Sequence, residues 1–152
     1  MTSRKRRRVT RSRVAEAPLF AYGAAQLLLD THAWLWLKEG SPRVGRRARA
    51  AIASATSVHL SIASAWEMAV KSAIGKVRTP SALNFASELD RDGFRPLAVT
   101  FEHIAVVRSL PLHHRDPFDR MLIAQAMHEG LTIVTADPHF ARYPVGVIDA
   151  TR

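Results

Sequence analysis

The sequence predicts an α/β domain in which a short parallel sheet lies between two layers of helices. Short apolar runs of the kind found in fully buried strands recur along the chain, for example Leu27–Leu29 and Leu131–Val134. Segments with helical periodicity, or with helix start and stop signals, separate these runs. Strands that alternate with helices in this way usually pair in parallel and carry helices on both faces.

Five strands are predicted, each from a short run of apolar residues. In chain order they are Leu27–Leu29, Val58–Ser61, Pro96–Val99, Leu131–Val134 and Val145–Ile148. The third run is the weakest because it begins with proline, which cannot donate a backbone hydrogen bond. The fourth run, Leu-Thr-Ile-Val, is the clearest because β-branched residues dominate it.

Seven helices are predicted between and after these strands. They are Thr31–Lys38, Arg43–Ala55, Ile62–Ile74, Pro80–Asp90, Thr100–Leu110, Asp116–Glu129 and Pro138–Tyr143. Residues 39–42, Glu-Gly-Ser-Pro, break the first helix, and the second is rich in alanine and arginine. In the third helix apolar residues recur at helical spacing, Ser61 can cap its start, and Gly75 ends it.

Two later helices begin at an aspartate followed by a proline. Asp116 and Pro117 open a helix that Gly130 stops, and Asp137 and Pro138 open the last short helix. Aspartate accepts hydrogen bonds from the first backbone N–H groups, and proline fits the first helical position without losing one. These pairs therefore fix where both helices begin.

The composition suits one domain that buries its own core. The chain has 152 residues, of which 47% are hydrophobic, a typical globular share. It has no cysteine, which excludes disulfides, thiolate metal sites and a cysteine nucleophile and suits a reducing compartment. No apolar run approaches the roughly 18 residues of a membrane span. We therefore expect a cytoplasmic protein that does not enter a membrane.

The net charge of +9 is concentrated at the N-terminus. The first thirteen residues contain seven basic residues and no acid, whereas the rest carries fifteen basic residues against thirteen acidic ones. Such a run is typical of a solvated arm, which can assist nucleic-acid binding electrostatically, and a start codon set too far upstream would give the same pattern. We expect residues 1–26 to form a disordered basic tail without an assigned role, and residues 27–152 to form the folded domain.

Four acidic residues lie at or near the predicted carboxyl ends of strands, where doubly wound sheets bind their ligands. Asp30 directly follows the first strand, where it could also cap the next helix, and Asp137 lies just past the fourth strand. Asp119 is in the first turn of the helix that leads into the fourth strand, and Glu67 is about two turns into the helix after the second. Converging carboxylates repel one another unless a cation holds them, and Mg²⁺ or Mn²⁺ prefers such oxygen ligands. A metal held in this way can activate water for phosphodiester cleavage.

Each of these acids also has a purely structural interpretation. Asp137 is a good helix cap, as is Asp116, and Asp119 would interact favourably with the dipole of its helix. Glu67 stands four residues before Lys71, which is the spacing of an ordinary surface ion pair. Taken singly, these residues favour the structural interpretation. Taken together at strand ends, they favour a metal site.

Four blocks of the sequence, in order, resemble the PIN-domain ribonucleases and, more closely, the VapC-type toxins of bacterial toxin–antitoxin pairs. The blocks are Leu28–Ala33, Ser61–Glu67, His114–Ala126 and Val134–Asp137. The resemblance runs from Leu27 to about Asp149 and implies a PIN-like α/β/α sandwich with a short central parallel sheet. It also implies endonucleolytic cleavage of RNA with Mg²⁺ or Mn²⁺.

The resemblance places the four acids of the family on Asp30, Glu67, Asp119 and Asp137. Thr31 and Thr135 would then be hydroxyls that orient carboxylates, and the capping argument makes Asp116 a structural residue. The resemblance further implies a cognate antitoxin whose tail fills the active-site groove, and a homodimer. In the loop before Asp116, residues 113–115 (His-His-Arg) could contact substrate phosphate or have no special role.

An alternative from another functional class is a non-catalytic RNA-binding module with a structural metal site. In that case the basic tail would bind RNA and the acids would only stabilise the fold. Unbalanced acids are a poor surface for RNA unless a metal is present. Neutralising Asp30 separates the two hypotheses, because only a nuclease would lose cleavage while RNA binding survives.

Overall fold

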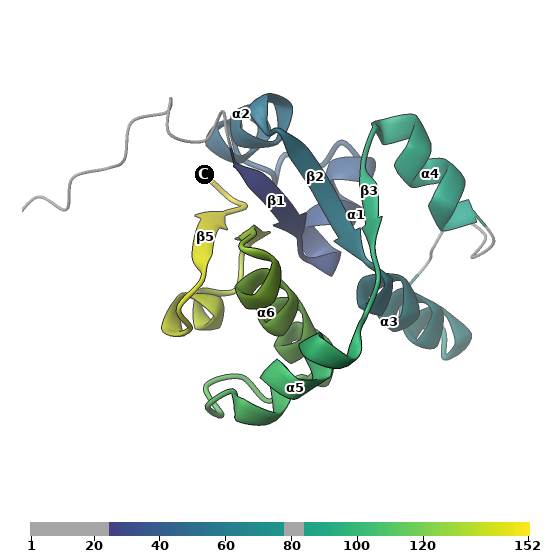
Figure 1. Ribbon diagram of the computed structural model, residues 1–152. Coiled ribbons are helices and arrows are strands. Elements are labelled where there is room, and N and C mark those ends of the chain that lie inside the picture. Colours follow the sequence, from purple (N-terminus) through teal and green to yellow (C-terminus); the bar gives the residue numbers. More distant parts are fainter. Residues whose placement is uncertain (1–24, 78–83) are drawn as a thin grey trace, which may run out of the picture.

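The computed structural model describes residues 25–77 and 84–152 and forms a single five-stranded sheet between helices (Figure 1). The strands are β1 (Gln26–Leu29), β2 (Ser57–Ser61), β3 (Arg95–Leu97), β4 (Thr132–Thr135) and β5 (Gly146–Asp149). The helices are α1 (Thr31–Lys38), α2 (Arg46–Ser54), α3 (Ile62–Ala73), α4 (Phe85–Asp92), α5 (Phe101–Ser109), α6 (Pro117–Glu129) and the 3₁₀ helix η3 (Pro138–Arg142). Residues 1–24 of the expected tail (residues 1–26) and the expected helix start at Pro80 lie outside the described residues.

All five strands are parallel and follow the order β3-β2-β1-β4-β5. The predicted α/β class with a parallel sheet is confirmed. Chain connections run from β1 towards β2 and β3 on one side and through β4 and β5 on the other. The strand order therefore reverses between β1 and β4, and ligands of such sheets bind at the carboxyl ends of the strands at this point.

The central strand β1 is buried on both faces, which explains its uninterrupted run of leucines. Leu27, Leu28 and Leu29 are each 0% exposed. Leu27 and Leu29 pack into the core beneath α1, α2, α3 and α4, whereas Leu28 packs into the core beneath α5, α6 and η3. Alternate side chains of a strand point to opposite faces, so β1 joins two separate cores. This arrangement is the predicted α/β/α sandwich.

The helix α2 begins three residues later than its alanine and arginine content predicts. Gly45 is its N-cap, and its N–H donates to the carbonyl of Ala150 at 2.9 Å. A Cβ atom built on Gly45 would lie 2.3 Å from the backbone carbon of Arg152. The Arg152 carbonyl in turn accepts from the N–H of Ala48 at 2.8 Å. This contact between distant segments, which local propensity does not encode, sets where α2 starts.

The other differences at the ends of elements are small. β1 begins at Gln26, one residue before the expected boundary of the tail, and β3 covers Arg95–Leu97 rather than 96–99. Among residues 25–77 and 84–152, no helix is both long and apolar enough to cross a bilayer.

Candidate active site

Asp30 leaves the end of β1 and is held by two hydrogen bonds. Its Oδ1 accepts the N–H of Ala33 at 2.6 Å, and its Oδ2 accepts the hydroxyl of Thr135 at the end of β4. The side chain thus caps α1, as its structural interpretation predicts, and also faces the reversal point between β1 and β4. It is only 6% exposed, and this burial raises its pKa even though both hydrogen bonds oppose the shift.

Glu67 reaches the same region from α3. The Thr31 hydroxyl donates to its Oε2 at 2.6 Å, and Lys71 forms an ion pair with its Oε1. The expected pair with Lys71 exists, but the expectation that it is a surface pair is wrong, because Glu67 is only 3% exposed. α3 packs against α1, and this packing places the carboxylate inside the domain. Thr31 and Thr135 therefore each hydrogen-bond to a carboxylate, as the resemblance implies.

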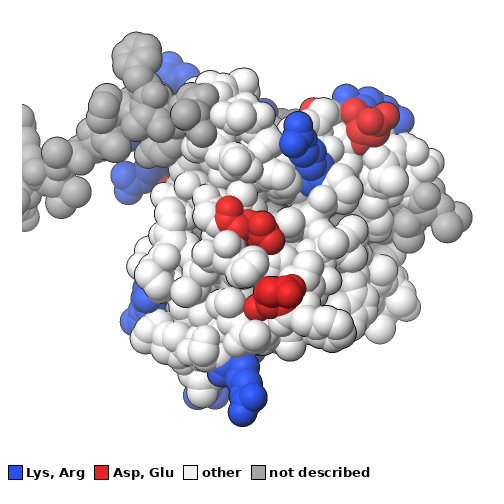
Figure 2. All heavy atoms as spheres, in the orientation of Figure 1, with Lys and Arg blue, Asp and Glu red and all other residues white. Residues whose placement is uncertain are grey.

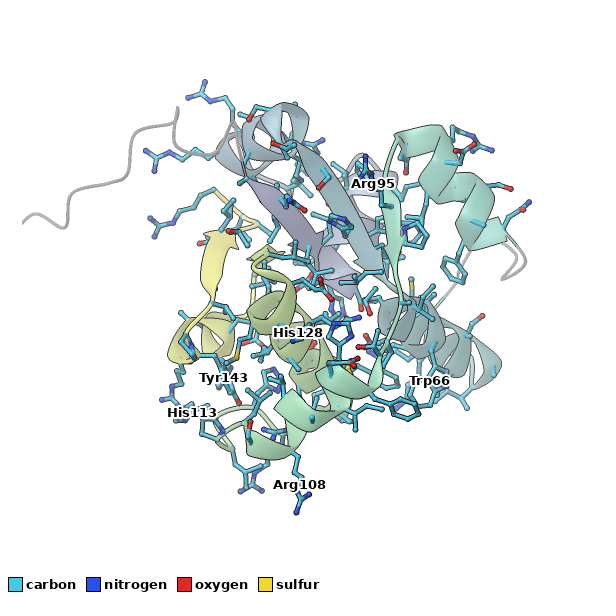
Figure 3. The ribbon with its side chains drawn as sticks, in the orientation of Figure 1. Trp66, Arg95, Arg108, His113, His128 and Tyr143 are labelled. Carbon is cyan, nitrogen blue, oxygen red and sulfur yellow. The ribbon has the colours of Figure 1, made fainter. Side chains whose placement is uncertain are left out.

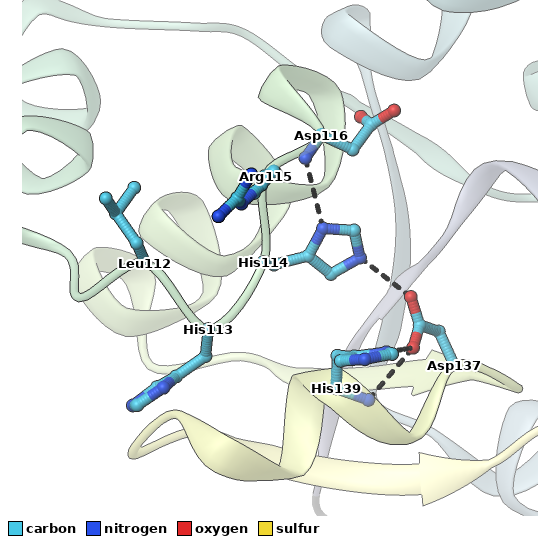
Figure 4. Close-up of a pocket in the computed structure, with 7 residues that line it drawn as sticks. All are labelled: Leu112, His113, His114, Arg115, Asp116, Asp137 and His139. Atoms are coloured by element: carbon cyan, nitrogen blue, oxygen red, sulfur yellow. Dashed lines mark hydrogen bonds and ion pairs between the residues drawn. The ribbon is translucent and has the colours of Figure 1, made fainter.

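Asp119 and Asp137 meet around the imidazole ring of His114. The ring Nε2 lies 3.1 Å from Asp119 Oδ2 and 2.7 Å from Asp137 Oδ2. On the other side of Asp137, Oδ1 accepts the backbone N–H of His139 at 2.9 Å and lies 2.7 Å from the Nδ1 of its ring (Figure 4). Two imidazole rings therefore hold the Asp137 carboxylate, which also caps η3.

The pKa values show that the acids interact through their charges. The pKa of Asp119 is raised to about 7, although His114 opposes the shift. Burial is the largest cause, followed by the Asp116 carboxylate and then by Glu67 and Asp30. Burial also acts to raise the pKa of Asp137, but the hydrogen bonds from His139 and His114 outweigh it and hold that pKa below its ordinary value. The acids are therefore costly to ionise together without a cation.

The donor set fits a divalent cation. Carboxylate oxygens of Asp119 and Asp137 lie within 4.8 Å of each other. The His114 ring nitrogen between them donates its proton to both, so the carboxylates, and not the ring, would hold the ion. Asp30 and Glu67 do not belong to that group of atoms, but both carboxylates are close enough to raise the pKa of Asp119. Carboxylate oxygens are the ligands that Mg²⁺ and Mn²⁺ prefer, and a cation here would offset the cost of burying several acids.

Asp116 does not join the carboxylates around His114. Its Oδ1 accepts the N–H groups of Phe118 at 2.9 Å and Asp119 at 3.1 Å, which makes it the N-cap of α6. This is the structural role expected from the proline that follows it. Its charge still matters to the site, since it is the largest charged contribution to the raised pKa of Asp119.

His114 is the one residue at the centre of the site that the sequence did not place there. As part of the loop of residues 113–115 it is expected either to contact substrate phosphate or to have no special role, but its ring lies on the carboxylates. Its Nδ1 accepts the N–H of Asp116 at 3.2 Å, which assigns the ring proton to Nε2, the nitrogen that faces Asp119 and Asp137. His114 therefore donates to the two carboxylates and draws them together.

The loop that carries His114 is fastened to α6 and η3 by two side chains. The guanidinium of Arg120 donates to four backbone carbonyl oxygens, each at 2.9 to 3.1 Å: those of Val107, Leu110, Pro111 and His114. The Tyr143 hydroxyl accepts the N–H of His114 at 2.7 Å and donates to the Pro111 carbonyl at 2.8 Å. These contacts fix the loop backbone, and so fix the place of the His114 ring.

A second cluster of possible ligands, formed by His103, His128 and Glu129, has a structural explanation. His103 is 0% exposed, and its Nδ1 accepts the backbone N–H of Thr100 at 3.0 Å. The ring proton is therefore on Nε2, which donates to Glu129 at 2.9 Å and is not free to bind a metal. The contact joins the capped start of α5 to the end of α6.

The raised pKa values predict how the stability of the metal-free protein depends on pH. Because Asp119 and Asp30 hold protons more tightly when folded than when unfolded, the free energy of unfolding should fall as the pH rises from about 4 to about 7, between the ordinary pKa of 3.8 and the raised pKa of Asp119. Mg²⁺ binds the ionised carboxylates, so it should reduce this loss. Thermal unfolding across this pH range, with EDTA or with Mg²⁺, measures both effects.

Asp119→Asn provides the control for this dependence on pH. Asparagine cannot titrate, so the metal-free variant should lose less stability over the same pH range than the parent protein. Equal slopes for the parent and the variant would contradict the assignment of the shifted titration to Asp119.

Comparison with known proteins gives one family match. The profile of the PIN domain matches residues 27–146, which is most of the chain and includes all four acids. Among curated proteins, none matches this sequence.

Solved structures match the whole domain at low sequence identity. A toxin–antitoxin complex from Klebsiella pneumoniae is 19% identical with a TM-score of 0.56, covering 82% of this chain and 97% of that chain. VapBC2 from Rickettsia felis, bound to a DNA fragment from its promoter, is 14% identical with a TM-score of 0.57, covering 81% and 97%. FitAcB from Neisseria gonorrhoeae is 22% identical with a TM-score of 0.56, covering 82% and 97%. These likenesses support the same fold.

Proposed function

This chain belongs to the PIN domain family, and from that premise we propose that it is a metal-dependent endoribonuclease, the toxin of a toxin–antitoxin pair. The observation that carries the proposal is the convergence of acids from four segments where the strand order reverses. The charges of these four acids act on one another: Asp30, Glu67, Asp119 and Asp137. Each acid also has a structural interpretation, in α1, α3, α6 and η3 respectively. An arrangement that is costly without a cation fits a metal site better than a purely structural role.

In this proposal, Asp119 and Asp137 hold Mg²⁺ or Mn²⁺, with Asp30 and Glu67 completing the set of acids. When bound, the ion supplies an activated water and neutralises charge on the phosphate that is cleaved. Thr135 keeps the Asp30 carboxylate oriented by donating its hydroxyl hydrogen, and Thr31 does the same for Glu67. Lys71 balances part of the charge on Glu67.

The proposal is tested by incubating the purified protein with total RNA in Mg²⁺, in excess EDTA, and in EDTA followed by excess Mn²⁺. We expect cleavage with either metal and none with EDTA. Single-stranded DNA incubated in parallel tests the choice of RNA. RNA that is bound but remains uncut with both metals would instead indicate a non-catalytic RNA-binding module with a structural metal site.

A cognate antitoxin is the partner we propose for the same site. The structural relatives include complexes of toxins with antitoxins, and the described acids leave a net negative charge around Asp119. A basic side chain from an antitoxin tail would neutralise this charge and exclude a metal ion and RNA together. With an antitoxin and RNA as its partners, the protein would act in the cytoplasm.

We also propose a homodimer that pairs through α3. Three of its apolar side chains and that of its C-cap residue recur every four residues and are 42% to 64% exposed: Ile62, Trp66, Val70 and Ile74. On the face seen in Figure 2, the surface over α3 carries no charged side chain, and Trp66 projects there in Figure 3. Exposed apolar stripes of this kind mark interfaces, and two-fold dimers are the commonest assemblies.

Trp66→Ala should weaken this dimer by about tenfold or more, because large aromatic side chains dominate interface energies. Light scattering during size-exclusion chromatography at several protein concentrations measures the association. Leu112→Ala is the control, since Leu112 is 76% exposed but lies away from α3. A parent protein that remains monomeric at all concentrations, or a Trp66→Ala variant that dimerises as the parent does, would contradict the proposed interface.

A further inference from the structure

A solvent-open pocket of about 410 Å³ adjoins the carboxylates and differs in charge from one end to the other. Its lining residues are Leu112, His113, His114, Arg115, Asp116, Asp137 and His139. Figure 4 shows the rings of His114 and His139 directed at Asp137, whereas His113 and Arg115 lie on the other side of His114. One end of the pocket is therefore formed by a carboxylate of the proposed metal site, and the other by a guanidinium and an imidazole.

Arg115 is free to bind a ligand. Its side chain is exposed and has neither an ion pair nor a hydrogen bond with any residue of the described part of the chain. The acid next to it, Asp116, caps α6, and its carboxylate points away from Arg115 in Figure 4. Arg120, only five residues on, uses its guanidinium on four backbone carbonyls. Arg115 therefore has no structural role of the kind that Arg120 has.

The backbone that carries Arg115 is held in place on both sides. His114 before it is fixed by Tyr143 through its N–H and by Arg120 through its carbonyl, and the N–H of Asp116 after it donates to the His114 ring. A cation on a braced loop loses less conformational freedom on binding than one on a mobile loop. The backbone at Arg115 is thus fixed beside the proposed metal site, and the fold does not use its guanidinium.

The charges of the two ends determine which ligand fits the pocket. The acidic end attracts an anion only through a bound metal, whereas the planar guanidinium of Arg115 binds a phosphate directly and with two parallel hydrogen bonds. A ligand that uses both ends must carry phosphates in succession along a flexible chain. A single strand of RNA has this pattern, whereas a lone phosphate or an apolar ligand does not.

We propose that Arg115, assisted by the His113 ring, binds the phosphate next to the one that is cleaved on a single RNA strand. The inference rests on the proposed nuclease function and adds to it the path of the substrate. The RNA strand would run from the acids at Asp137 across His114 to the loop. The enzyme would then contact the RNA backbone and not the bases. Such contacts bind RNA strongly without selecting its sequence.

The test measures binding of a fluorescent RNA strand of about ten nucleotides by anisotropy, in Mg²⁺ and in an Asp30→Asn background, in which we expect cleavage to be slow. Arg115→Ala should weaken binding about tenfold and reduce the slope of log K against log salt by about one. The matched control is Arg95→Ala, which removes the same charge from an exposed arginine at the start of β3, at the opposite edge of the sheet (Figure 3). Arg95→Ala should change neither the affinity for RNA nor the slope of log K against log salt.

A neutral methylphosphonate placed at each RNA position in turn locates the contact. At one position, the methylphosphonate should weaken binding of the RNA to the protein with Arg115 about tenfold. The same RNA should bind the Arg115→Ala variant as well as unmodified RNA does, because the two changes remove the same interaction. Equal binding by the Arg115→Ala and Arg95→Ala variants would overturn the proposed phosphate site, as would a dependence on Arg115 seen only with DNA. If RNA binding depends on Arg115 but the parent protein cleaves no RNA, the nuclease proposal fails and the phosphate site stands.

Discussion

Asp30→Asn should lower the rate of RNA cleavage by more than about 100-fold while the protein remains folded. Even residues that only orient metal ligands are worth about 10- to 100-fold in affinity or activity, so removal of a ligand charge should exceed this. The fold should tolerate the change, because the amide oxygen can still accept the N–H of Ala33 and the amide nitrogen can donate to Thr135. Removing a buried charge should leave the stability of the metal-free protein equal or higher.

The measurement is single-turnover cleavage of RNA at saturating Mg²⁺, together with thermal unfolding in EDTA. Asp149→Asn is the matched control, because Asp149 also ends a strand but is exposed and hydrogen-bonds to Thr151. We expect this variant to cleave at the parent rate. Cleavage by Asp30→Asn within a few fold of the parent would remove Asp30 from the site and with it the central argument for the nuclease.

Arg120→Ala should lower the free energy of unfolding by about 2–3 kcal/mol and reduce cleavage by at least about tenfold. Hydrogen bonds from a charged donor contribute about 1.5–3 kcal/mol each, and four carbonyls lose such a donor, although water can replace part of the loss because the side chain is only half-buried. The loop then loses its attachment to α6, and the His114 ring loses its fixed place between Asp119 and Asp137.

Arg120→Lys separates charge from geometry in this prediction. Lysine keeps the positive charge but cannot reach four carbonyls with one ammonium group, so it should recover only part of the stability. Urea unfolding of the metal-free protein and cleavage at saturating Mg²⁺ measure the two effects, with Arg108→Ala on the exposed side of α5 as the control (Figure 3). If Arg120→Ala unfolds at the same urea concentration as Arg108→Ala, the loop does not depend on this guanidinium.

Local signals in the sequence were enough to predict most of the fold. The α1 helix occupies the expected residues because Asp30 caps it and residues 39–42 cannot continue it. The α6 helix begins and ends where an aspartate–proline pair and Gly130 predict. The α2 helix was misjudged because its start depends on Gly45 meeting Arg152, more than one hundred residues away. Local propensity carries no information on such a contact.

For the site too, the sequence predicts what local signals determine and misses what depends on tertiary packing. The position of Asp30 after a buried strand is visible in the sequence, because every parallel strand ends at the same edge of the sheet. The burial of Glu67 and the place of His114 were not visible. The first depends on how α3 packs against α1, and the second depends on a loop that Arg120 and Tyr143 hold against two other elements.

The central position of β1 also determines when the protein can finish folding. Its first neighbour, β2, lies about thirty residues further along the chain, but Thr135, which binds Asp30 from β4, is 105 residues away. Contacts between such distant segments form slowly because a long loop must close first. Before β4 has been synthesised, one side of β1, with its three consecutive leucines, is therefore unpaired and open to aggregation. Only a nearly complete polypeptide can assemble the acids, so fragments released early from the ribosome should be harmless as nucleases and prone to precipitate.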